Sequence, residues 1–357
     1  MAGQVKLQQD SIVLLGAGYT ARALIARLRA RGLQIFATSR DGRDLKMRDV
    51  TSIAFNGAPN AQLTRALQNA RYILSSIAPH HGGDPVIRAY PALAQIAENC
   101  RWAGYLSATS VYGDRGGKWA FEDELLAPKT ARGRARADAE ITWIESEMPV
   151  HIFRLAGIYG PGRSPFQKII NGTARSITRP GHVSNRVHVD DIVSAILASI
   201  DAPNPQRIYN IADDNPAPSH EVISHASDML GAKRPVKIGH TDSSLSHMAR
   251  SFFIENKRVH TGRAKRELGW SPQYASYHEG LPATLKAEKL SPSGVTLTGH
   301  IEIAQGELQA VQDALPEHIR LSQQETGCLQ FSVTQDVAVP TRYHVYERFM
   351  DRGSFIA

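Results

Sequence analysis

Short apolar runs alternate with amphipathic stretches through the first 160 residues of the chain. The runs have the length and composition of buried strands, and the stretches between them space their apolar residues as helices do. The strands expected from this pattern are Ser11–Leu15, Gln34–Thr38, Tyr72–Ser76, Gly104–Ser107 and His151–Leu155, with helices at Ala21–Arg31, Ala61–Ala70 and Pro85–Asn99. Such alternation predicts a parallel sheet with helices on both faces.

The pattern changes in the second half of the chain. Val187–Ile200 and Ser219–Leu230 are expected to be helices, and Ser219 is a suitable N-cap. A Pro/Ser/Gly-rich segment ends near residue 290, where we place a domain boundary between residues 1–290 and 291–357. Beyond it, Val295–Ala304, Cys328–Thr334 and Tyr343–Phe349 alternate like strands around an expected helix at Glu307–Gln324. This order predicts part of an antiparallel α+β domain.

Charge supports the same division. Residues 291–357 hold 4 Arg, no Lys and 8 acidic residues, and residues 1–290 hold the other 37 basic and 26 acidic residues. The basic part could attract an anionic cofactor or substrate. A nucleic-acid partner is the rival hypothesis, but no basic run is interleaved with aromatic residues, so we expect none. Cys100 and Cys328 lie far apart, which favours reduced thiols over a disulfide or a metal site.

No apolar run is long enough to span a bilayer, and the first residues, MAGQVKLQQD, lack the apolar core of a secretion signal. We therefore expect a cytoplasmic protein with no membrane partner.

The segment from Ser11 to Ala21 carries the clearest chemical signal. An apolar strand leads directly into Gly16-Ala-Gly18-Tyr19-Thr20-Ala21, and a helix follows at once. In this motif Gly16 permits the tight turn, Gly18 lets the backbone approach a pyrophosphate, and Ala21 packs the helix on the strand. The N–H groups of the first helical turn, from Tyr19 and Thr20 onward, then face the phosphates. The pattern predicts a dinucleotide site.

The end of the second expected strand indicates which dinucleotide is bound. A site for NAD usually places a carboxylate there to bind the ribose 2′-hydroxyl. This chain has Thr38-Ser39-Arg40, and a guanidinium beside small hydroxyls suits a 2′-phosphate. The residues favour NADP. Because Asp41 follows directly, NAD stays an alternative, as does an ordinary solvated role for Arg40.

Four further segments resemble extended short-chain dehydrogenases/reductases of the NAD-dependent epimerase/dehydratase type. They are Tyr105-Leu-Ser-Ala-Thr-Ser-Val-Tyr-Gly-Asp114, Arg154-Leu-Ala-Gly-Ile-Tyr-Gly-Pro-Gly162, Asn185-Arg-Val-His-Val-Asp-Asp-Ile192 and Arg266-Glu-Leu-Gly-Trp-Ser-Pro272. The resemblance covers roughly residues 10–285. It implies a Rossmann-type, doubly wound α/β domain, a substrate lobe mainly from residues 155–285, and a small-molecule substrate.

The departures from this family concern the catalytic pair. No tyrosine in the chain is followed four residues later by lysine. If Glu140 matches the family's Glu, Arg132 and Arg136 occupy the positions of the catalytic Tyr and Lys. Arginine has too high a pKa to act as a base near neutrality, but Arg136 could hold a ribose or phosphate. Either these arginines serve a ligand, or they lie on a solvated helix face.

If the chain is catalytic, other groups must then move the proton. The candidates by motif position are Thr109, Ser110, Tyr112 and Tyr159, and Tyr112 is the strongest because a phenol both donates and accepts. A structural role for Tyr112 is the alternative. His80 and His81 follow a strand end and could act as acids or simply pack the loop. His188, Asp190 and Asp191 fit a structural helix start, where carboxylates satisfy the helix dipole.

Residues 295–351 resemble the antibiotic biosynthesis monooxygenase family, a group of small ferredoxin-like α+β domains. The resembling residues are Val295–His300, His318, Glu325-Thr-Gly-Cys-Leu-Gln-Phe331 and Val345-Tyr-Glu-Arg-Phe349. The resemblance implies a domain that dimerises or oxidises aromatic or quinol-like substrates, with His318, His344 and Glu347 as residues to test. The domain looks incomplete, and an exposed sheet edge must be covered either by a partner, as in a homodimer through this domain, or by the large domain.

Three functions stay open at this point. The first is an NADP-dependent oxidoreductase or epimerase-like enzyme acting on a small substrate near Thr109 and Tyr112. The second is a dinucleotide-binding sensor without catalysis, which the missing Tyr and Lys favour. The third is a bifunctional protein in which a reductase is fused to a cofactor-independent monooxygenase.

Overall fold

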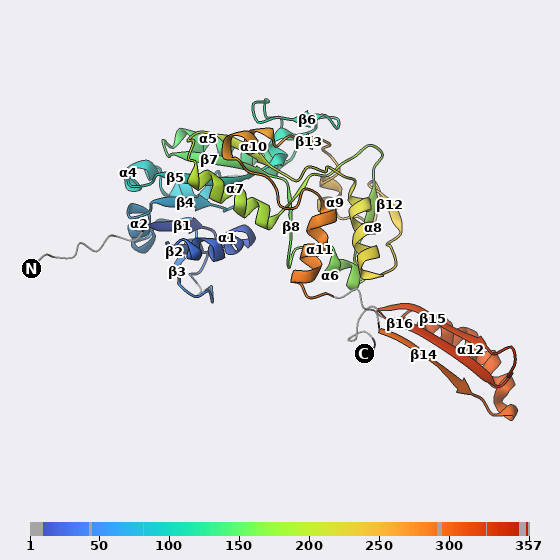
Figure 1. Cartoon of the computed structure of the whole chain (residues 1–357). Coiled ribbons are helices and arrows are strands. Elements are labelled where there is room, and N and C mark those ends of the chain that lie inside the picture. The colour runs from blue at the N-terminus through green and yellow to red at the C-terminus, as the bar shows by residue number, and fades with distance from the viewer. Residues whose placement is uncertain are drawn as a thin grey trace, which may run out of the picture. The chain divides into compact units, whose positions relative to one another are not determined.

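The structure is a computed structural model that describes residues 10–42, 45–80, 82–290, 295–325, 327–349 and 355. The chain divides into two compact units (Figure 1). The first comprises residues 1–159, 181–216 and 244–277, and the second comprises residues 160–180, 217–243 and 278–357. The predicted boundary between residues 290 and 291 stays a prediction. Of the helices in the described ranges, none has both the length and the apolar composition needed to cross a membrane.

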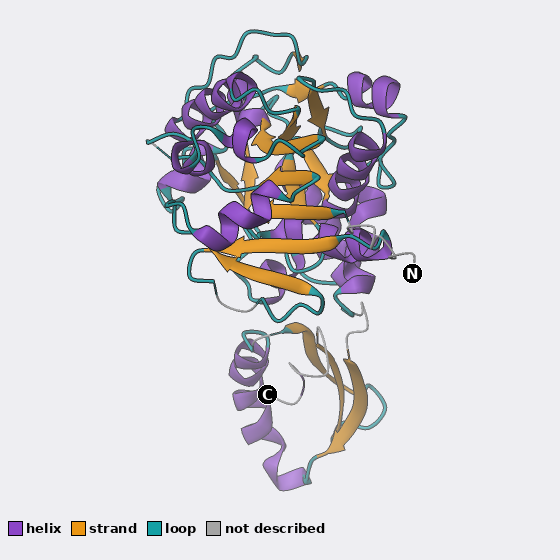
Figure 2. Cartoon of the chain, turned by 90° about the vertical axis from the view of Figure 1, so that its left-hand side faces the viewer, coloured by secondary structure: helices purple, strands orange, loops and turns teal. Residues whose placement is uncertain are grey.

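A seven-stranded parallel sheet forms the centre of the first unit (Figure 2). Its strands are β1 (Ser11–Leu15), β2 (Gln34–Ser39), β3 (Val50–Ala54), β4 (Tyr72–Ser75), β5 (Trp102–Ala108), β7 (Val150–Leu155) and β11 (Ile208–Ile211). They lie in the order β11-β7-β5-β4-β1-β2-β3, so the winding reverses between β1 and β4. The predicted doubly wound α/β fold is confirmed. The apolar pattern had indicated five of these strands.

Alternate residues of β1 explain how one strand serves two cores. Ile12 and Leu14 pack with α1 (Tyr19–Ala30) and α7 (Val189–Asp201) on one face, whereas Val13 and Leu15 pack with α2 (Ala61–Gln68) and α5 (Ala131–Glu145) on the other. This alternation is the two-residue period of a strand. The helices of this unit are α1 (Tyr19–Ala30), α2 (Ala61–Gln68), α3 (Pro85–Ala89), α4 (Leu93–Ile96), the 3-10 turn η1 (Thr109–Tyr112), α5 (Ala131–Glu145), α7 (Val189–Asp201), α9 (His247–Ser251) and α10 (Gly262–Leu268).

The prediction of one continuous helix at Pro85–Asn99 is wrong. Pro85–Asn99 was expected as a single helix, but the structure has the two short helices α3 and α4. Pro91 lies between them and cannot donate a backbone hydrogen bond, so the helix breaks there.

Short parallel strand pairs complete the unit: β6 (Trp119–Ala120) with β13 (Arg258–Val259), and β8 (Gly157–Tyr159) with β10 (Arg186–His188).

The second unit contains α6 (Phe166–Ile170), β9 (Ser176–Thr178), α8 (Ser219–Leu230), β12 (Lys237–Gly239) and nearly all of α11 (Tyr277–Ala287). It also contains β14 (Val295–Glu302), the turn η2 (Gln305–Glu307), α12 (Leu308–Ser322), β15 (Cys328–Gln335) and β16 (Arg342–Phe349). The last three strands form an antiparallel sheet in the order β14-β16-β15. The Gln312 amide on α12 donates to the Tyr343 hydroxyl at 3.1 Å, which fixes the helix on the sheet. The predicted α+β arrangement is confirmed.

Candidate functional site

The turn after β1 has the geometry that its glycines predict. Gly16 adopts a φ of +92°, and its N–H donates to Thr38 Oγ1 at 2.8 Å. Ser76 Oγ donates to the Gly16 carbonyl at 2.7 Å, so the turn is fixed from β2 and from β4. A Cβ on residue 16 would meet Ile77 Cγ1 at 2.9 Å. Both the left-handed backbone and the close approach therefore require glycine at this position.

Gly18 and the residues after it form the start of α1. Gly18 is the N-cap, is exposed and has an ordinary φ of −74°, and a Cβ there would meet only Ser76 Oγ, at 3.9 Å. Space for a ligand therefore exists where the motif expects one. Tyr19, Thr20 and Ala21 make up the first turn, whose N–H groups lack carbonyl partners within the helix. Ala21 is buried against the core, as close helix–strand packing requires.

A cavity of about 420 Å³ opens beside this turn, and we call it the dinucleotide cavity. Its walls come from the carboxyl ends of β1, β2 and β4, the edge at which parallel sheets bind ligands. It is lined by Gly16, Ala17, Arg22, Thr38, Ser39, Arg40, Leu45, Phe55, Asn56, Gly57, Ile77, Ala78, His80 and Pro85. Three of the predicted cofactor residues, Gly16, Ser39 and Arg40, are thus brought together.

The rim of the dinucleotide cavity is polar and basic. Arg40 is exposed, and the buried Ser39 hydroxyl has no hydrogen-bond partner within the described ranges. Sequence reasoning missed Arg22, whose Nε donates to the Ala17 carbonyl at 3.0 Å, although its place one residue after the motif could have indicated it. Two guanidinium groups therefore border this cavity, and guanidinium binds phosphate well.

A second cavity, of about 360 Å³, lies at the carboxyl ends of β5 and β7, and we call it the substrate-side cavity. It is lined by Ala108, Thr109, Ser110, Thr130, Arg132, Arg136, Leu155, Ala156, Gly157, His182, Val183, Ser184, Asn185, Ser251, Phe252, Glu255 and Lys257. Of the predicted residues, Thr109, Ser110 and Arg136 are in this set, together with Arg132. Segments far apart in sequence therefore converge here.

The start of α5 is fixed closely against the η1 turn. Thr130 is the N-cap, and its Oγ1 accepts the Gly133 N–H at 3.0 Å. A Cβ on Gly133 would lie 2.8 Å from the Ser110 carbonyl oxygen, so glycine allows this contact. Arg136 donates to the Leu106 carbonyl at 2.8 Å. These contacts pack the start of α5 against η1 and hold Arg136 beside the end of β5.

Tyr112, the strongest sequence candidate for proton transfer, lies in the core. It is 0% exposed and is not among the residues that line the substrate-side cavity. Its hydroxyl accepts from Arg154 at 2.9 Å and donates to Asn210 Oδ1 at 2.7 Å. Burial raises the pKa of this phenol to about 12. The geometry gives Tyr112 a structural role, and Tyr159 is likewise buried, with its ring edge against His188.

The Tyr112 hydroxyl belongs to a buried polar network. The Arg154 guanidinium contacts the Glu140 carboxylate through Nε at 3.1 Å and through its terminal nitrogen at 2.8 Å. The Ser107 hydroxyl donates to the same carboxylate at 2.5 Å. Arg154 also donates to the Glu122 carbonyl at 3.0 Å. The network ties α5 to β5 and β7, so the family-like motifs around residues 107 and 154 act here as a scaffold.

Lys257 is the functional candidate that sequence reasoning missed. Its side chain is 8% exposed, and its ammonium donates to Glu255 Oε2 at 2.7 Å and to the Gly113 carbonyl at 2.8 Å. The second bond attaches it to the end of the η1 turn. Burial lowers the pKa of the Lys257 amine. No fixed spacing relates Lys257 to the other motifs, so the sequence offered no signal for it.

The remaining sequence candidates divide between the sites. His80 borders the dinucleotide cavity, where its Nδ1 accepts from the Gly82 N–H at 3.0 Å, and His81 lies outside the described residues. Asp191 is buried and accepts the backbone N–H groups of Gln273 and Tyr274, at 2.6 and 3.2 Å. Burial raises the Asp191 pKa to about 6. Asp191 thus connects the start of α7 to the loop at Gln273 and Tyr274, in addition to the favourable interaction with the helix dipole expected from the sequence.

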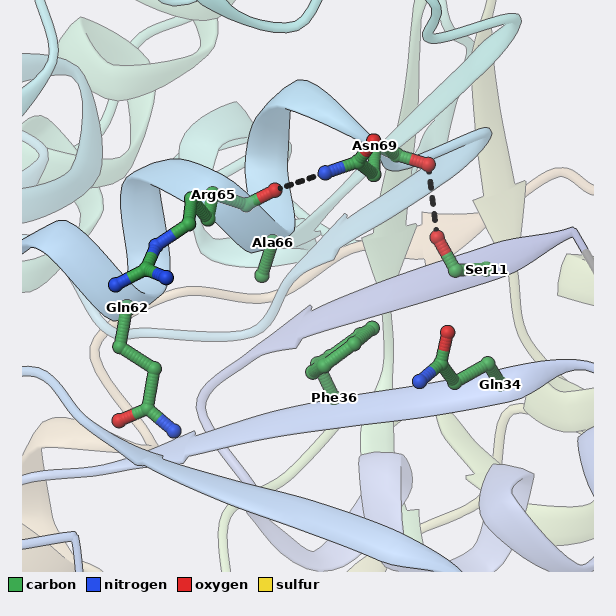
Figure 3. Close-up of a pocket in the computed structure, with 7 residues that line it drawn as sticks. All are labelled: Ser11, Gln34, Phe36, Gln62, Arg65, Ala66 and Asn69. Atoms are coloured by element: carbon green, nitrogen blue, oxygen red, sulfur yellow. Dashed lines mark hydrogen bonds between the residues drawn. The ribbon is translucent and has the colours of Figure 1, made fainter. Parts of the chain in front are cut away.

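A third hollow, shown in Figure 3, lies at the amino-terminal ends of the sheet strands, opposite the two cavities described above. It is lined by Ser11, Gln34, Phe36, Gln62, Arg65, Ala66 and Asn69. Ser11 and Gln34 begin β1 and β2, so this is the amino edge of the strands. The Ser11 hydroxyl donates to the Asn69 carbonyl at 2.9 Å, and the Asn69 amide donates to the Arg65 carbonyl at 2.8 Å (Figure 3). The Ser11 hydroxyl thus fastens the end of α2 to β1, at the end of the strand opposite the glycine turn.

Known proteins with similar sequences and structures show which family this chain belongs to. A solved structure of a functionally unknown conserved protein from Silicibacter pomeroyi DSS is 40% identical to this chain, and the match covers 80% of this chain and 100% of that chain with a TM-score of 0.74. The chain belongs to the family of this protein. Protein YeeZ of Escherichia coli (strain K12) is 28% identical over 282 residues, which are 74% of this chain and 96% of YeeZ.

More distant solved structures show the fold. DesIV, a dTDP-glucose 4,6-dehydratase from Streptomyces venezuelae solved with NAD and TYD bound, is 19% identical, with a TM-score of 0.64 over 79% of this chain and 97% of DesIV. The fold is therefore that of NAD-dependent epimerase/dehydratase-type short-chain dehydrogenases/reductases, as the motifs implied. Residues 294–357 match the family model for antibiotic biosynthesis monooxygenase, which confirms the second resemblance.

Of the three residues singled out in the monooxygenase-like segment, His344 lies apart from the other two, because Glu347 is paired across the sheet with Phe331, the residue that His318 contacts. His344 and Glu347 are three positions apart on β16, so they point to opposite faces of the sheet. His344 Nε2 lies 2.8 Å from Asp336 Oδ2, and His318 on α12 packs its ring edge against Phe331. In the described part of the chain, no group of three or more His, Cys, Asp or Glu side chains is placed to hold a metal ion.

Proposed function

We propose that this chain is an NADP-dependent oxidoreductase that acts on a small molecule in the substrate-side cavity. The observation that carries the proposal is the pair of cavities at the carboxyl edge of one parallel sheet, one beside the glycine turn and one beside η1. Ligands of such sheets bind at this edge. The fold that this chain shares with DesIV supports dinucleotide binding, because DesIV was solved with NAD bound.

The residues of the dinucleotide cavity fit this cofactor. Gly16 permits the tight turn, and Gly18 leaves room for a diphosphate against the start of α1. The N–H groups there carry the positive end of the helix dipole. Arg22, Ser39 and Arg40 would hold a 2′-phosphate, which is our reason for preferring NADP over NAD. The chemistry that the cofactor supplies when bound is the gain or loss of a hydride.

The chain's own contribution to chemistry would come from the substrate-side cavity. Thr109 and Ser110 offer hydroxyls that can orient a bound oxygen, and Arg136 offers a guanidinium beside them. Arginine does not release a proton near neutrality. We therefore assign proton movement at the substrate's oxygen to Lys257, with Glu255 beside it. A lysine whose pKa is lowered by burial suits this task.

The first test concerns the glycine turn. Gly18→Val should weaken NADPH binding by about 100-fold or more, because a branched side chain would occupy the space left for the diphosphate. The variant should fold, since residue 18 is exposed and has an ordinary φ. Quenching of protein fluorescence on NADPH titration measures the affinity. Gly239→Val, at an exposed glycine of β12 with equal space for a Cβ, is the control; unchanged NADPH affinity in Gly18→Val contradicts the proposal.

The second test concerns the choice of dinucleotide. Arg40→Ala should weaken NADPH binding about 10- to 100-fold and leave NADH binding nearly unchanged, because only NADPH carries the phosphate that the guanidinium would contact. The same titration with each nucleotide gives both affinities. Arg27→Ala, at an exposed arginine on α1 outside the cavity, controls for the loss of one positive charge. Equal losses for NADPH and NADH would show that Arg40 has no phosphate role.

A non-catalytic sensor is the second candidate function. The burial of Tyr112 and the arginines at positions 132 and 136 favour it, since the usual proton relay is missing. NADPH oxidation across a panel of carbonyl compounds separates the two functions: turnover supports the enzyme, and tight binding with no turnover supports the sensor.

The monooxygenase-family match keeps a bifunctional protein open as a third candidate. Oxygen uptake with hydroquinones tests it. Self-association through residues 291–357 and a cytoplasmic location stay predictions.

A further inference from the structure

More positively charged than negatively charged side chains line the substrate-side cavity. Arg132, Arg136 and Lys257 all line the cavity, whereas Glu255 is the one carboxylate among the lining residues. Glu255 is already paired with Lys257 at 2.7 Å. Within the described ranges, Arg132 and Arg136 form no salt bridge. Arg136 donates to a carbonyl, and it is only a minor influence on Asp84, whose pKa is raised by burial.

These arginines also oppose the stability of their own helix. Both lie in the first half of α5, whose first turn contains no acidic residue. Arg132, in that first turn, faces the positive end of the helix dipole. Arg132 and Arg136 are four residues apart, so they share one face and repel each other. An arrangement that costs helix stability and lines a cavity indicates a negative charge supplied from outside the chain.

The detailed contacts show how an anion would be held. Arg132 is exposed, its terminal nitrogen reaches Ser251 Oγ at 3.3 Å, and its guanidinium lies 5.6 Å from the centre of the Phe252 ring. Most of its donors are therefore available. The Lys257 ammonium has three N–H donors, of which Glu255 and Gly113 use two, so one is left for a group in the cavity.

We propose that the substrate-side cavity binds an organic carboxylate, with Arg132 and Arg136 as its cationic contacts and the exposed Phe252 ring against its apolar part. A carboxylate matches the forked geometry of guanidinium, and the cavity of about 360 Å³ admits a small molecule. This inference rests on the proposed function only in taking the cavity as the substrate site. It names the substrate class as small carboxylic acids with an apolar portion.

Benzoate is a direct probe of this site, and benzamide is its uncharged counterpart. Titration of the full chain, without nucleotide, should show benzoate binding at least about tenfold tighter than benzamide, because only the former carries the charge. Arg132→Met should lower benzoate affinity about tenfold or more. Arg134→Met, an exposed arginine on the same helix that does not line the cavity, should leave it unchanged.

Each other outcome overturns the proposal. Absence of benzoate binding up to about 10 mM, equal binding of benzamide, or equal losses in Arg132→Met and Arg134→Met would each remove the carboxylate site. Competition between benzoate and NADPH would assign these cations to the nucleotide instead. Because the titration needs no nucleotide, failure of NADPH binding with benzoate binding intact would overturn the proposed function and leave the carboxylate site standing.

Discussion

Lys257→Met should lower the rate of NADPH-dependent turnover by about 100- to 10,000-fold, the usual contribution of a positioned proton donor. Methionine keeps an unbranched side chain, one atom shorter than that of lysine, but cannot donate a proton. NADPH affinity should stay unchanged, because Lys257 does not line the dinucleotide cavity. Steady-state rates with a panel of small carboxylic acids that carry a carbonyl group, together with NADPH titration of the same preparation, measure both quantities.

The pH dependence gives this prediction a specific sign. The Lys257 ammonium must carry its proton to donate it, and burial lowers the pKa of this amine. Reduction should therefore slow as the pH rises through that lowered pKa, at a lower pH than for an ordinary lysine. Lys257→Arg keeps the charge and the donors but holds its proton throughout this range. Full activity in Lys257→Arg would show that Lys257 acts only through its charge and would contradict proton transfer.

Arg154→Met should destabilise the first unit by about 3–5 kcal/mol, because it leaves the Glu140 carboxylate buried without its cation. Glu140 has a side chain that is 2% exposed, so water cannot take the place of the guanidinium. The substitution also removes the donors to the Tyr112 hydroxyl and to the Glu122 carbonyl. Urea unfolding followed by tryptophan fluorescence measures the change, since Trp102, Trp119, Trp143 and Trp270 all belong to the first unit.

A surface pair supplies the matched control for this variant. Arg31 contacts Asp201 with both terminal nitrogens, at 2.6 and 2.7 Å, but the pair is exposed to solvent. Arg31→Met should cost less than about 1 kcal/mol, because water solvates Asp201 once the arginine is gone. The double variant Arg154→Met with Glu140→Met should recover part of the loss, since no buried charge is left unpaired. Equal costs for Arg154→Met and Arg31→Met would mean that the buried network contributes little.

The two predictions separate two roles that the sequence motifs could not distinguish. The segments around Ser107 and Arg154 resemble catalytic and substrate-side motifs of the family, yet their polar side chains meet in a closed buried network. In contrast, Lys257 comes from an unremarkable stretch and lies in the cavity. Resemblance to a family's motifs therefore located the scaffold of the site, and the contacts decide which side chains can reach a ligand.

The sequence by itself determined the strand–turn–helix at residues 11–21, the alternation of strands and helices, and the α+β character of residues 295–349. These follow from local causes: a two-residue or 3.6-residue apolar period, and glycines where the backbone needs a positive φ. It also predicted Gly16, Gly18, Ser39 and Arg40 as cofactor residues, because the ends of neighbouring parallel strands share one edge of the sheet. The structure brings Gly16, Ser39 and Arg40 to one cavity.

Only the tertiary structure decided the contents of the substrate-side cavity. Arg132, Ser184 and Lys257 come from segments separated by some fifty to seventy residues, and no sequence period relates them. It likewise decided that Tyr112 is buried. The exposure of a side chain and the groups beside it depend on how distant segments pack, which local propensities do not specify.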